Sequence, residues 1–228
     1  MKTTLLALFV ALTIPSQIFP QWEWLNPRPH GNANNRIAFG GNANEYTIVG
    51  NAGIIMKTTN DGVDWSIQNS GTDINLKDIY ISGNEGIAVG NSGTILRTSD
   101  GGITWHLVNS GTTTHLTAVA FPTSNIGIIT GWNGLILHTT NGGTNWDSIA
   151  TPTTQRLYGV SFADADNGYA VGNAGVILKT TNGGVSWNSQ TSGTVQSLYD
   201  VSYVSPSTAV ATGGSGTIIR TTDGGSNW

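Results

Sequence analysis

Hydrophobic and polar positions alternate in short runs along most of the chain, and glycine or asparagine separates one run from the next. The segment 157–190 reads LYGVSF, GYAVG, GVILKT, the turn TNGG and then SWNSQ. Alternation with a period of two predicts strands, and the glycine-rich breaks predict tight turns. We therefore expect each such unit to form a four-stranded antiparallel meander, with the LYGVSF strand innermost and the tryptophan strand outermost.

This unit recurs along the chain. Tryptophans stand 40, 41, 41 and 41 residues apart, at Trp65, Trp105, Trp146, Trp187 and Trp228. Glycines that close the second strand have the same spacing, at Gly50, Gly90, Gly131, Gly172 and Gly213. Four strands in about 40 residues are typical of a propeller blade. The predicted fold is therefore all-β, a β-propeller of four-stranded antiparallel blades, of which five are present.

The blades are predicted at 35–69, 76–109, 116–150, 157–190 and 198–228. The last one is incomplete, because the chain stops at the tryptophan of its fourth strand. Residues 22–34 form a predicted closing strand and lead-in, because Trp24 lies 41 residues before Trp65. Two interpretations follow: residues 22–27 close a five-bladed ring, or the chain is a fragment of a propeller of about seven blades. The fragment is favoured, because Trp24 and Trp228 would compete for one position in a five-bladed ring.

The turn before each repeated tryptophan carries the sharpest motif, Thr-x-(Asn/Asp)-x-Gly-x-x-Trp, which is known as the Asp-box or bacterial neuraminidase repeat. The Asn or Asp oxygen is expected to accept backbone N–H bonds, the glycine to take a positive φ, and the tryptophan to pack between sheets. A residue present in every blade is explained by the blade, so we predict a structural role. The residues are Asn60, Gly62, Trp65, Asp100, Gly102, Trp105, Asn141, Gly143, Trp146, Asn182, Gly184, Trp187, Asp223, Gly225 and Trp228.

A cation or histidine occupies one position in the third strand of every blade, at Lys57, Arg97, His138, Lys179 and Arg220. We predict a ring of cations that are either solvated or paired with turns. A functional basic ring for an acidic partner is the alternative interpretation.

The first residues resemble an export signal, with Lys2 followed by the apolar run LLALFVALTI, which is too short to span a bilayer. We predict a signal peptide at 1–21 and a secreted, periplasmic or cell-surface location, with no transmembrane segment in the mature chain. The absence of cysteine excludes disulfides and thiolate metal sites, and no cofactor or metal is predicted. A net charge of -4 with scattered Lys and Arg argues against nucleic acid as a partner.

The segments GTILRTSDGGITW (93–105) and GVILKTTNGGVSW (175–187) resemble repeats of the photosystem II stability and assembly factor family, whose members are Asp-box propellers. The resemblance implies the fold, and it implies binding of a partner through an arginine-rich face. This chain has only five arginines, two of them in the repeated cationic position, which puts that particular mode of binding in doubt. We expect a non-catalytic exported scaffold that binds a protein or a glycan.

A glycoside hydrolase, sialidase-like or xyloglucanase-like, is the alternative function. A sialidase would need three convergent arginines, and only Arg28, Arg36 and Arg156 lie outside the repeated position. A xyloglucanase-type enzyme would need two carboxylates facing each other across a cleft. The sequence pairs none of the candidates outside the Asp-boxes, which are Asp73, Asp78, Asp164, Asp166 and Asp200.

Binding residues are expected where the loops of one blade differ from those of the others. The loop between second and third strands holds Asn or Gly first in four blades and Trp132 in one. His115 and Arg156 directly precede the inner strands of successive blades, so the three residues are predicted to share one sector of a face. An exposed tryptophan beside histidine and arginine is a plausible contact for a sugar or a peptide.

Overall fold

In the computed structural model, which describes residues 31–40 and 42–228, the chain forms five antiparallel sheets. The first strands of the sheets are β1 (Asn34–Phe39), β5 (Leu76–Ser82), β9 (Leu116–Ala120), β13 (Leu157–Phe162) and β17 (Leu198–Ser205). The second strands are β2 (Tyr46–Gly50), β6 (Glu85–Gly90), β10 (Gly127–Gly131), β14 (Gly168–Gly172) and β18 (Thr208–Gly213). The third are β3 (Ile55–Thr58), β7 (Ile95–Thr98), β11 (Ile136–Thr139), β15 (Ile177–Thr180) and β19 (Ile218–Thr221). The fourth are β4 (Ser66–Gln68), β8 (His106–Val108), β12 (Asp147–Ile149) and β16 (Asn188–Gln190).

Each sheet is a simple meander, which confirms the predicted blade. Strands pair only with their neighbours in sequence, so the first strand and the tryptophan strand form the two edges. The second and third strands are joined by a 3-10 turn whose glycine has a positive φ, for example Trp132–Gly134 with Gly134 at φ 69°. Among the described residues the last sheet has three strands, β17, β18 and β19.

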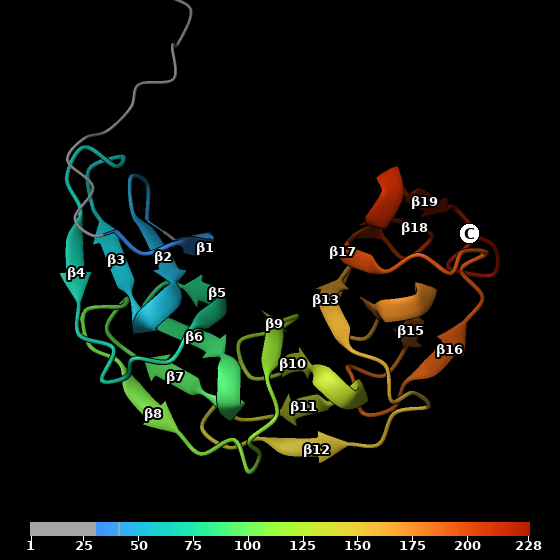
Figure 1. The fold of residues 1–228 in the computed structure, drawn as a ribbon, viewed down its shortest axis with the longest axis horizontal. Helices are drawn as coiled ribbons and strands as arrows, with labels where there is room; N and C mark the ends of the chain where they lie inside the picture. The colour runs from blue at the N-terminus through green and yellow to red at the C-terminus, as the bar shows by residue number, and fades with distance from the viewer. Residues whose placement is uncertain (1–30, 41) are drawn as a thin grey trace, which may run out of the picture.

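The five blades follow one another around an open arc (Figure 1), with the first strands on the concave side and the fourth strands on the convex side. Within residues 31–40 and 42–228 the sheets do not close into a ring. The predicted signal peptide and the closing strand at 22–27 lie outside the described residues. The number of blades in the complete ring therefore stays a prediction.

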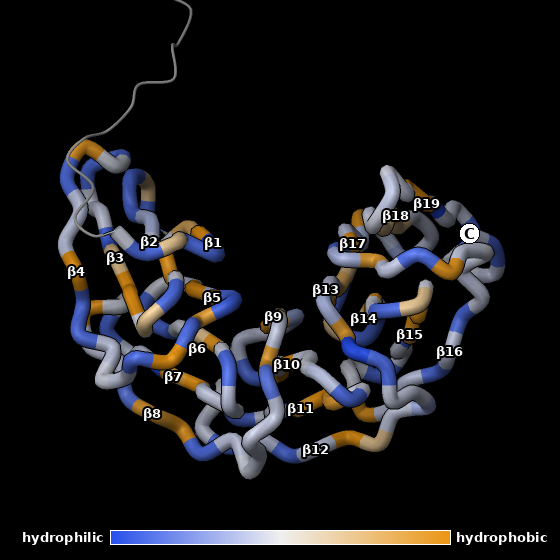
Figure 2. Tube along the Cα trace, in the orientation of Figure 1, coloured by the Kyte–Doolittle hydropathy of each residue, from blue (hydrophilic) through white to orange (hydrophobic). Residues whose placement is uncertain are grey.

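The core lies between blades. Ile87 and Val89 of one blade pack in a single cluster with Leu116, Val119 and Trp146 of the next. Figure 2 shows the same arrangement as hydrophobic stretches along the strands and hydrophilic turns between them. Burial of both faces of the sheet explains why second strands such as β10 and β14 are buried at every position and carry no charged residue.

The two ends of the arc show what a neighbouring blade contributes. Phe39 is 72% exposed on the first blade, whereas Ile81 at the equivalent position of the second blade is 7% exposed. Ile218 is 72% exposed on the last blade, whereas Ile177 on the fourth is fully buried. These apolar side chains are exposed because no described sheet covers them.

Candidate functional site

The polar groups of each Asp-box turn form hydrogen bonds within the same turn. In the second blade, Asp100 Oδ1 accepts hydrogen bonds from the backbone of Ile103 and Thr104, at 3.0 and 2.9 Å. Thr98 Oγ1 accepts from Gly102 N, and Trp105 Nε1 donates to Gly102 O. Hydrogen bonds from the Thr104 hydroxyl, the Thr104 backbone N–H and the Thr98 hydroxyl hold the pKa of the Asp100 carboxyl well below its usual range. The structural role of these turns stays a prediction, which the Trp146 variant described in the Discussion would test.

The cationic positions of the third strands join adjacent blades. Lys57 Nζ donates to Gly101 O at 2.9 Å, and Lys179 Nζ donates to Gly224 O at 2.6 Å. Arg97 Nε donates to Gly142 O at 3.2 Å, so the acceptor is the first Asp-box glycine of the following blade in all three cases. The prediction that these residues pair with turns is confirmed for Lys57, Arg97 and Lys179. The alternative that they are solvated is wrong for Lys57, which is 8% exposed, whereas Arg220 on the last described blade is exposed. The side chains of Lys57, Arg97 and Lys179 therefore link adjacent blades.

His138 occupies the same position at the junction between the third and fourth blades. It is 8% exposed, and its Nε2 has no hydrogen-bond partner among the described residues. Burial lowers the pKa of His138, and this effect is partly opposed by the Gly183 carbonyl and by Asp147. The imidazole therefore fills the junction as a neutral ring.

The structure brings His115, Trp132 and Arg156 together. The guanidinium carbon of Arg156 lies 3.7 Å above the centre of the Trp132 ring, and the His115 ring meets the same indole edge-on at 4.4 Å between ring centres. Arg156 is exposed. Trp132 is partly buried, whereas the sequence predicts an exposed tryptophan. The three side chains come from adjacent blades and form one sector, which we call the Trp132 cluster.

His115 also has a structural task that the sequence does not reveal. Its Nδ1 accepts a hydrogen bond from Ser92 N in the preceding blade, at 2.9 Å. Asn75 Oδ1 makes the equivalent bond to Ala52 N one blade earlier, at 2.8 Å. His115 therefore positions the edge of the cluster, and Arg156 is the member whose polar groups face solvent.

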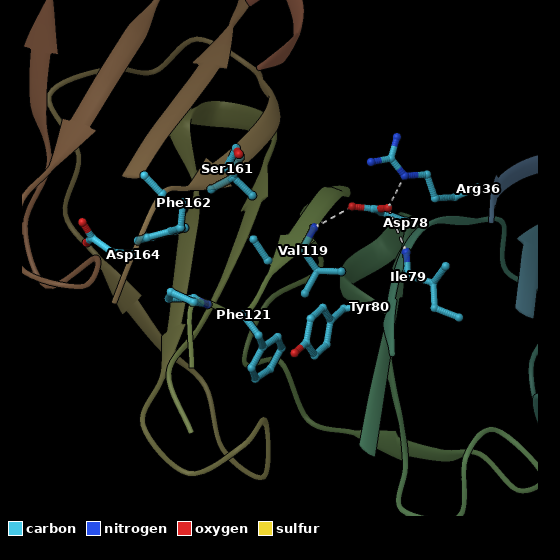
Figure 3. A pocket seen from close by; sticks show the side chains of 13 residues that line it. Arg36, Asp78, Ile79, Tyr80, Val119, Phe121, Ser161, Phe162 and Asp164 are labelled. Atoms are coloured by element: carbon cyan, nitrogen blue, oxygen red, sulfur yellow. Dashed lines mark hydrogen bonds and ion pairs between the residues drawn. The ribbon is translucent and has the colours of Figure 1, made fainter. Parts of the chain in front are cut away.

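A second candidate site, which we call the axial cleft, lies on the concave side of the arc (Figure 3). It has a volume of about 430 Å³ and is lined by the inner strands β5, β9 and β13. Tyr80 and Phe121 are stacked in its wall, with ring centres 4.8 Å apart. Asp78 and Asp164 lie on opposite sides of the cleft in this view.

Asp78 joins three blades at the edge of the axial cleft. Its Oδ1 lies 3.1 Å from Arg36 Nε and accepts a hydrogen bond from Ile79 N, and its Oδ2 accepts from Val119 N at 2.9 Å. Burial nevertheless raises the pKa of Asp78 to about 6, because desolvation outweighs these donors and Asp200 adds a like charge. Hydrogen bonds from Asn167 and Asp166 instead lower the pKa of the exposed Asp164.

The raised pKa of Asp78 predicts a dependence of stability on pH. The folded protein holds this proton up to about pH 6, whereas an unfolded chain releases it near pH 4, so the stabilisation present at low pH is lost as the pH rises through 6. Raising the pH from 4.5 to 7.5 should therefore lower the free energy of unfolding by about 2 kcal/mol through this group. Denaturant titrations of wild type and Asp78→Asn at both pH values measure the difference, because every other carboxyl titrates in both proteins. Parallel pH profiles would contradict the assignment.

The described residues contain no group of three or more His, Asp or Glu side chains that could hold a metal ion. In the same part of the chain, no helix has the length and apolar character needed to cross a membrane. The other carboxylates proposed as hydrolase candidates are dispersed, and only Asp78 and Asp164 line the axial cleft.

Five antiparallel blades with Asp-box turns define an Asp-box β-propeller. The sequence profile of the family described as Photosynthesis system II assembly factor YCF48 matches residues 63–159 and 144–197, more than half of the chain, and the chain belongs to this family. No curated protein sequence matches the chain significantly.

Solved structures show the same fold. YCF48 bound to D1 peptide has a TM-score of 0.62 and 17% identity, with 88% of this chain and 81% of that chain covered. YCF48 from Cyanidioschyzon merolae has a TM-score of 0.70 and 20% identity, with 86% and 69% covered. The GH74 xyloglucanase from Xanthomonas campestris has a TM-score of 0.67 and 14% identity, with 84% of this chain but only 37% of that enzyme covered. At these identities the likeness establishes the fold and no more.

The sequence predicts the Trp132 cluster but not the axial cleft. Asp78 and Arg36 appear in the sequence as isolated charges, and their contact depends on how far the inner strands of neighbouring blades are displaced. One signal was available: the equivalent inner-strand position holds a different residue in most blades, at Arg36, Asp78, Ala118, Gly159 and Asp200. A position that varies in a regular repeat is where a particular site can form.

Proposed function

We propose that the chain is a non-catalytic, exported binding scaffold that captures a protein partner at the Trp132 cluster. The observation that carries this proposal is the Arg156 guanidinium, whose central carbon lies 3.7 Å from the centre of the Trp132 ring. Arg156 is exposed and has no ion pair among the described residues. The guanidinium is planar, and contact with the indole restricts its movement, so its exposed N–H donors can make a two-point contact with a carboxylate. The preferred ligand group is therefore an acidic side chain or chain terminus of a protein.

The family and its structures support a protein ligand. YCF48 has been solved with a bound D1 peptide, which is a property of that protein. Here the likeness supports the class of partner, and the Trp132 cluster supplies the chemistry. Export rests on the signal-like segment at 1–21 alone, and comparison of the mature N-terminus with the full sequence would test it.

Binding of defined peptides to Arg156 variants tests the proposal. On an array of peptides that carry Asp, Glu or neutral residues at one position, wild type should prefer the acidic members. Arg156→Gln should weaken their binding about tenfold, the loss of one charge-assisted contact, while Arg156→Lys should recover only part of it. Equal binding of acidic and neutral peptides by wild type would contradict carboxylate capture. Preferential binding on a parallel glycan array would favour a sugar ligand.

Glycoside hydrolysis is a second candidate, which one observation favours. Asp78 with its raised pKa and Asp164 with its lowered pKa line the same cleft, as a general acid and its partner base would. However, the Asp78 side chain is 9% exposed, and its oxygens already accept two hydrogen bonds and form an ion pair with Arg36, so binding ranks first. Turnover of aryl glycosides by wild type, lost in Asp164→Asn, would reverse this ranking.

A further inference from the structure

We propose that the axial cleft is a second binding site, in which an extended peptide segment adds as a strand to the free inner edge of β13. This inference is independent of carboxylate capture at the Trp132 cluster. It rests on the backbone N–H groups of Val160 and Phe162 on β13. Equivalent N–H groups in neighbouring blades donate to side chains, whereas these two have no side-chain acceptor among the described residues.

The ladder between β13 and β14 fixes which groups point into the cleft. Ala163 N donates to Asn167 O, and the register pairs Ser161 with Tyr169, so these are the hydrogen-bonded pairs. Pairs alternate in an antiparallel ladder, so Val160 and Phe162 direct their N–H and C=O groups away from β14. Both residues line the axial cleft.

In neighbouring blades the N–H equivalent to that of Val160 is satisfied by an aspartate. Val119 N donates to Asp78 Oδ2, and Val201 N donates to Asp200 Oδ1, both at 2.9 Å. For Val160, the residue equivalent to Asp78 is Ala118 in the preceding blade, and the residue equivalent to Asp200 is Gly159. Neither residue has a side-chain hydrogen-bond acceptor.

The N–H of Phe162 is open for the same reason. Its equivalent, Tyr203 N, donates to Ser161 Oγ in the preceding blade at 3.1 Å. The residue in the place of Ser161 one blade earlier is Ala120. Among the described residues, the N–H and C=O groups of Val160 and Phe162 on β13 therefore have no side-chain partner. These two residues are separated by one residue along the strand.

This spacing matches the backbone of an extended peptide, which offers a donor and an acceptor at every second residue. The stacked Tyr80 and Phe121 rings give an apolar side chain of that peptide a contact in the same cleft. Arg36 is paired with Asp78, whereas Asp164 stays charged and has no ion pair among the described residues. The ligand class is therefore an extended, apolar peptide with one basic residue.

The test uses the full chain and one synthetic probe, an acetylated and amidated heptapeptide of alternating threonine and valine with a central phenylalanine and one lysine near an end. Two-dimensional amide spectra should show shifts of the Val160 and Phe162 signals on titration, and their hydrogen exchange should slow. A probe with N-methyl groups on one edge should bind about tenfold more weakly, because it cannot complete the ladder.

The sharpest variant is Ala118→Asn with Ala120→Ser, which supplies the acceptors that Asp78 and Ser161 provide elsewhere. It should melt no lower than wild type and bind the probe about tenfold more weakly. Ala150→Ser on the exposed linker is the matched control, and Arg156→Gln should leave probe affinity unchanged. Unshifted amides of Val160 and Phe162, or equal binding by the capped variant, would overturn the proposal.

Discussion

Trp146→Ala is expected to lower the free energy of unfolding by about 3–5 kcal/mol, the usual range for truncation of a buried aromatic side chain. Trp146 is 8% exposed, and its ring meets Phe121 edge-on with centres 5.9 Å apart. Its Nε1 donates to Gly143 O at 3.2 Å, so the change also leaves a buried carbonyl without its partner. Chemical denaturation monitored by far-ultraviolet circular dichroism measures the loss.

The matched control is the same substitution at Trp132, which lies outside the repeated motif. Trp132 is partly buried, and its main contacts are the Arg156 guanidinium and the His115 ring. Its truncation should cost about 1 kcal/mol, the sum of a cation–π contact and an edge-on ring contact at a surface. If both variants lost the same stability, the distinction between a structural tryptophan and a site tryptophan would be wrong.

The second large effect is expected for Gly184→Ala, at about 3–4 kcal/mol. Gly184 has φ +90°, where a side chain is strained, and a Cβ there would overlap Cδ1 of Ile128 in the preceding blade. The strained backbone accounts for about 1–2 kcal/mol, and overpacking accounts for the rest. Thermal and denaturant unfolding of the purified variant give the value.

Two further variants separate the two causes. Gly193→Ala has a similar φ of +73° with no atom within 4 Å of the added Cβ, so it should show the backbone cost alone. Adding Ile128→Val to Gly184→Ala removes the Cδ1 atom that the new Cβ would overlap and adds no buried polar group. The double variant should recover the part due to overpacking. Equal losses for Gly184→Ala and Gly193→Ala would show that the contact between blades is not tight.

The strands and turns could be predicted from the sequence because every local signal repeats. The alternation in LYGVSF, the positive φ of the second Asp-box glycine and the inward tryptophan each appear in all blades, so one blade explains the others. The Trp132 cluster could be predicted for the opposite reason, since Trp132 breaks the repeat at a loop position.

Outside the Trp132 cluster, the particular partners of side chains across blades could not be predicted, because they depend on the displacement of one sheet against the next. The pairing of Lys57 with the Gly101 carbonyl needs the side chain to reach the following blade, and a strand pattern gives no such distance. Likewise, Asp78 becomes a buried carboxyl only because Val119 and Arg36 come from the two flanking sheets. A repeat predicts its own unit better than the junctions between units.

The hydrogen bonds between adjacent blades have a consequence for how the chain folds. Lys57 contacts Gly101 across 44 residues, Arg97 contacts Gly142 across 45, and Ser161 contacts Tyr203 across 42. Each such contact closes a loop of one blade's length, and the entropy of closing it is the same wherever it occurs along the chain. Folding can therefore start in any pair of adjacent blades and grow by one blade at a time in either direction. The rate should be set by docking one blade on its neighbour and not by the total length of the chain.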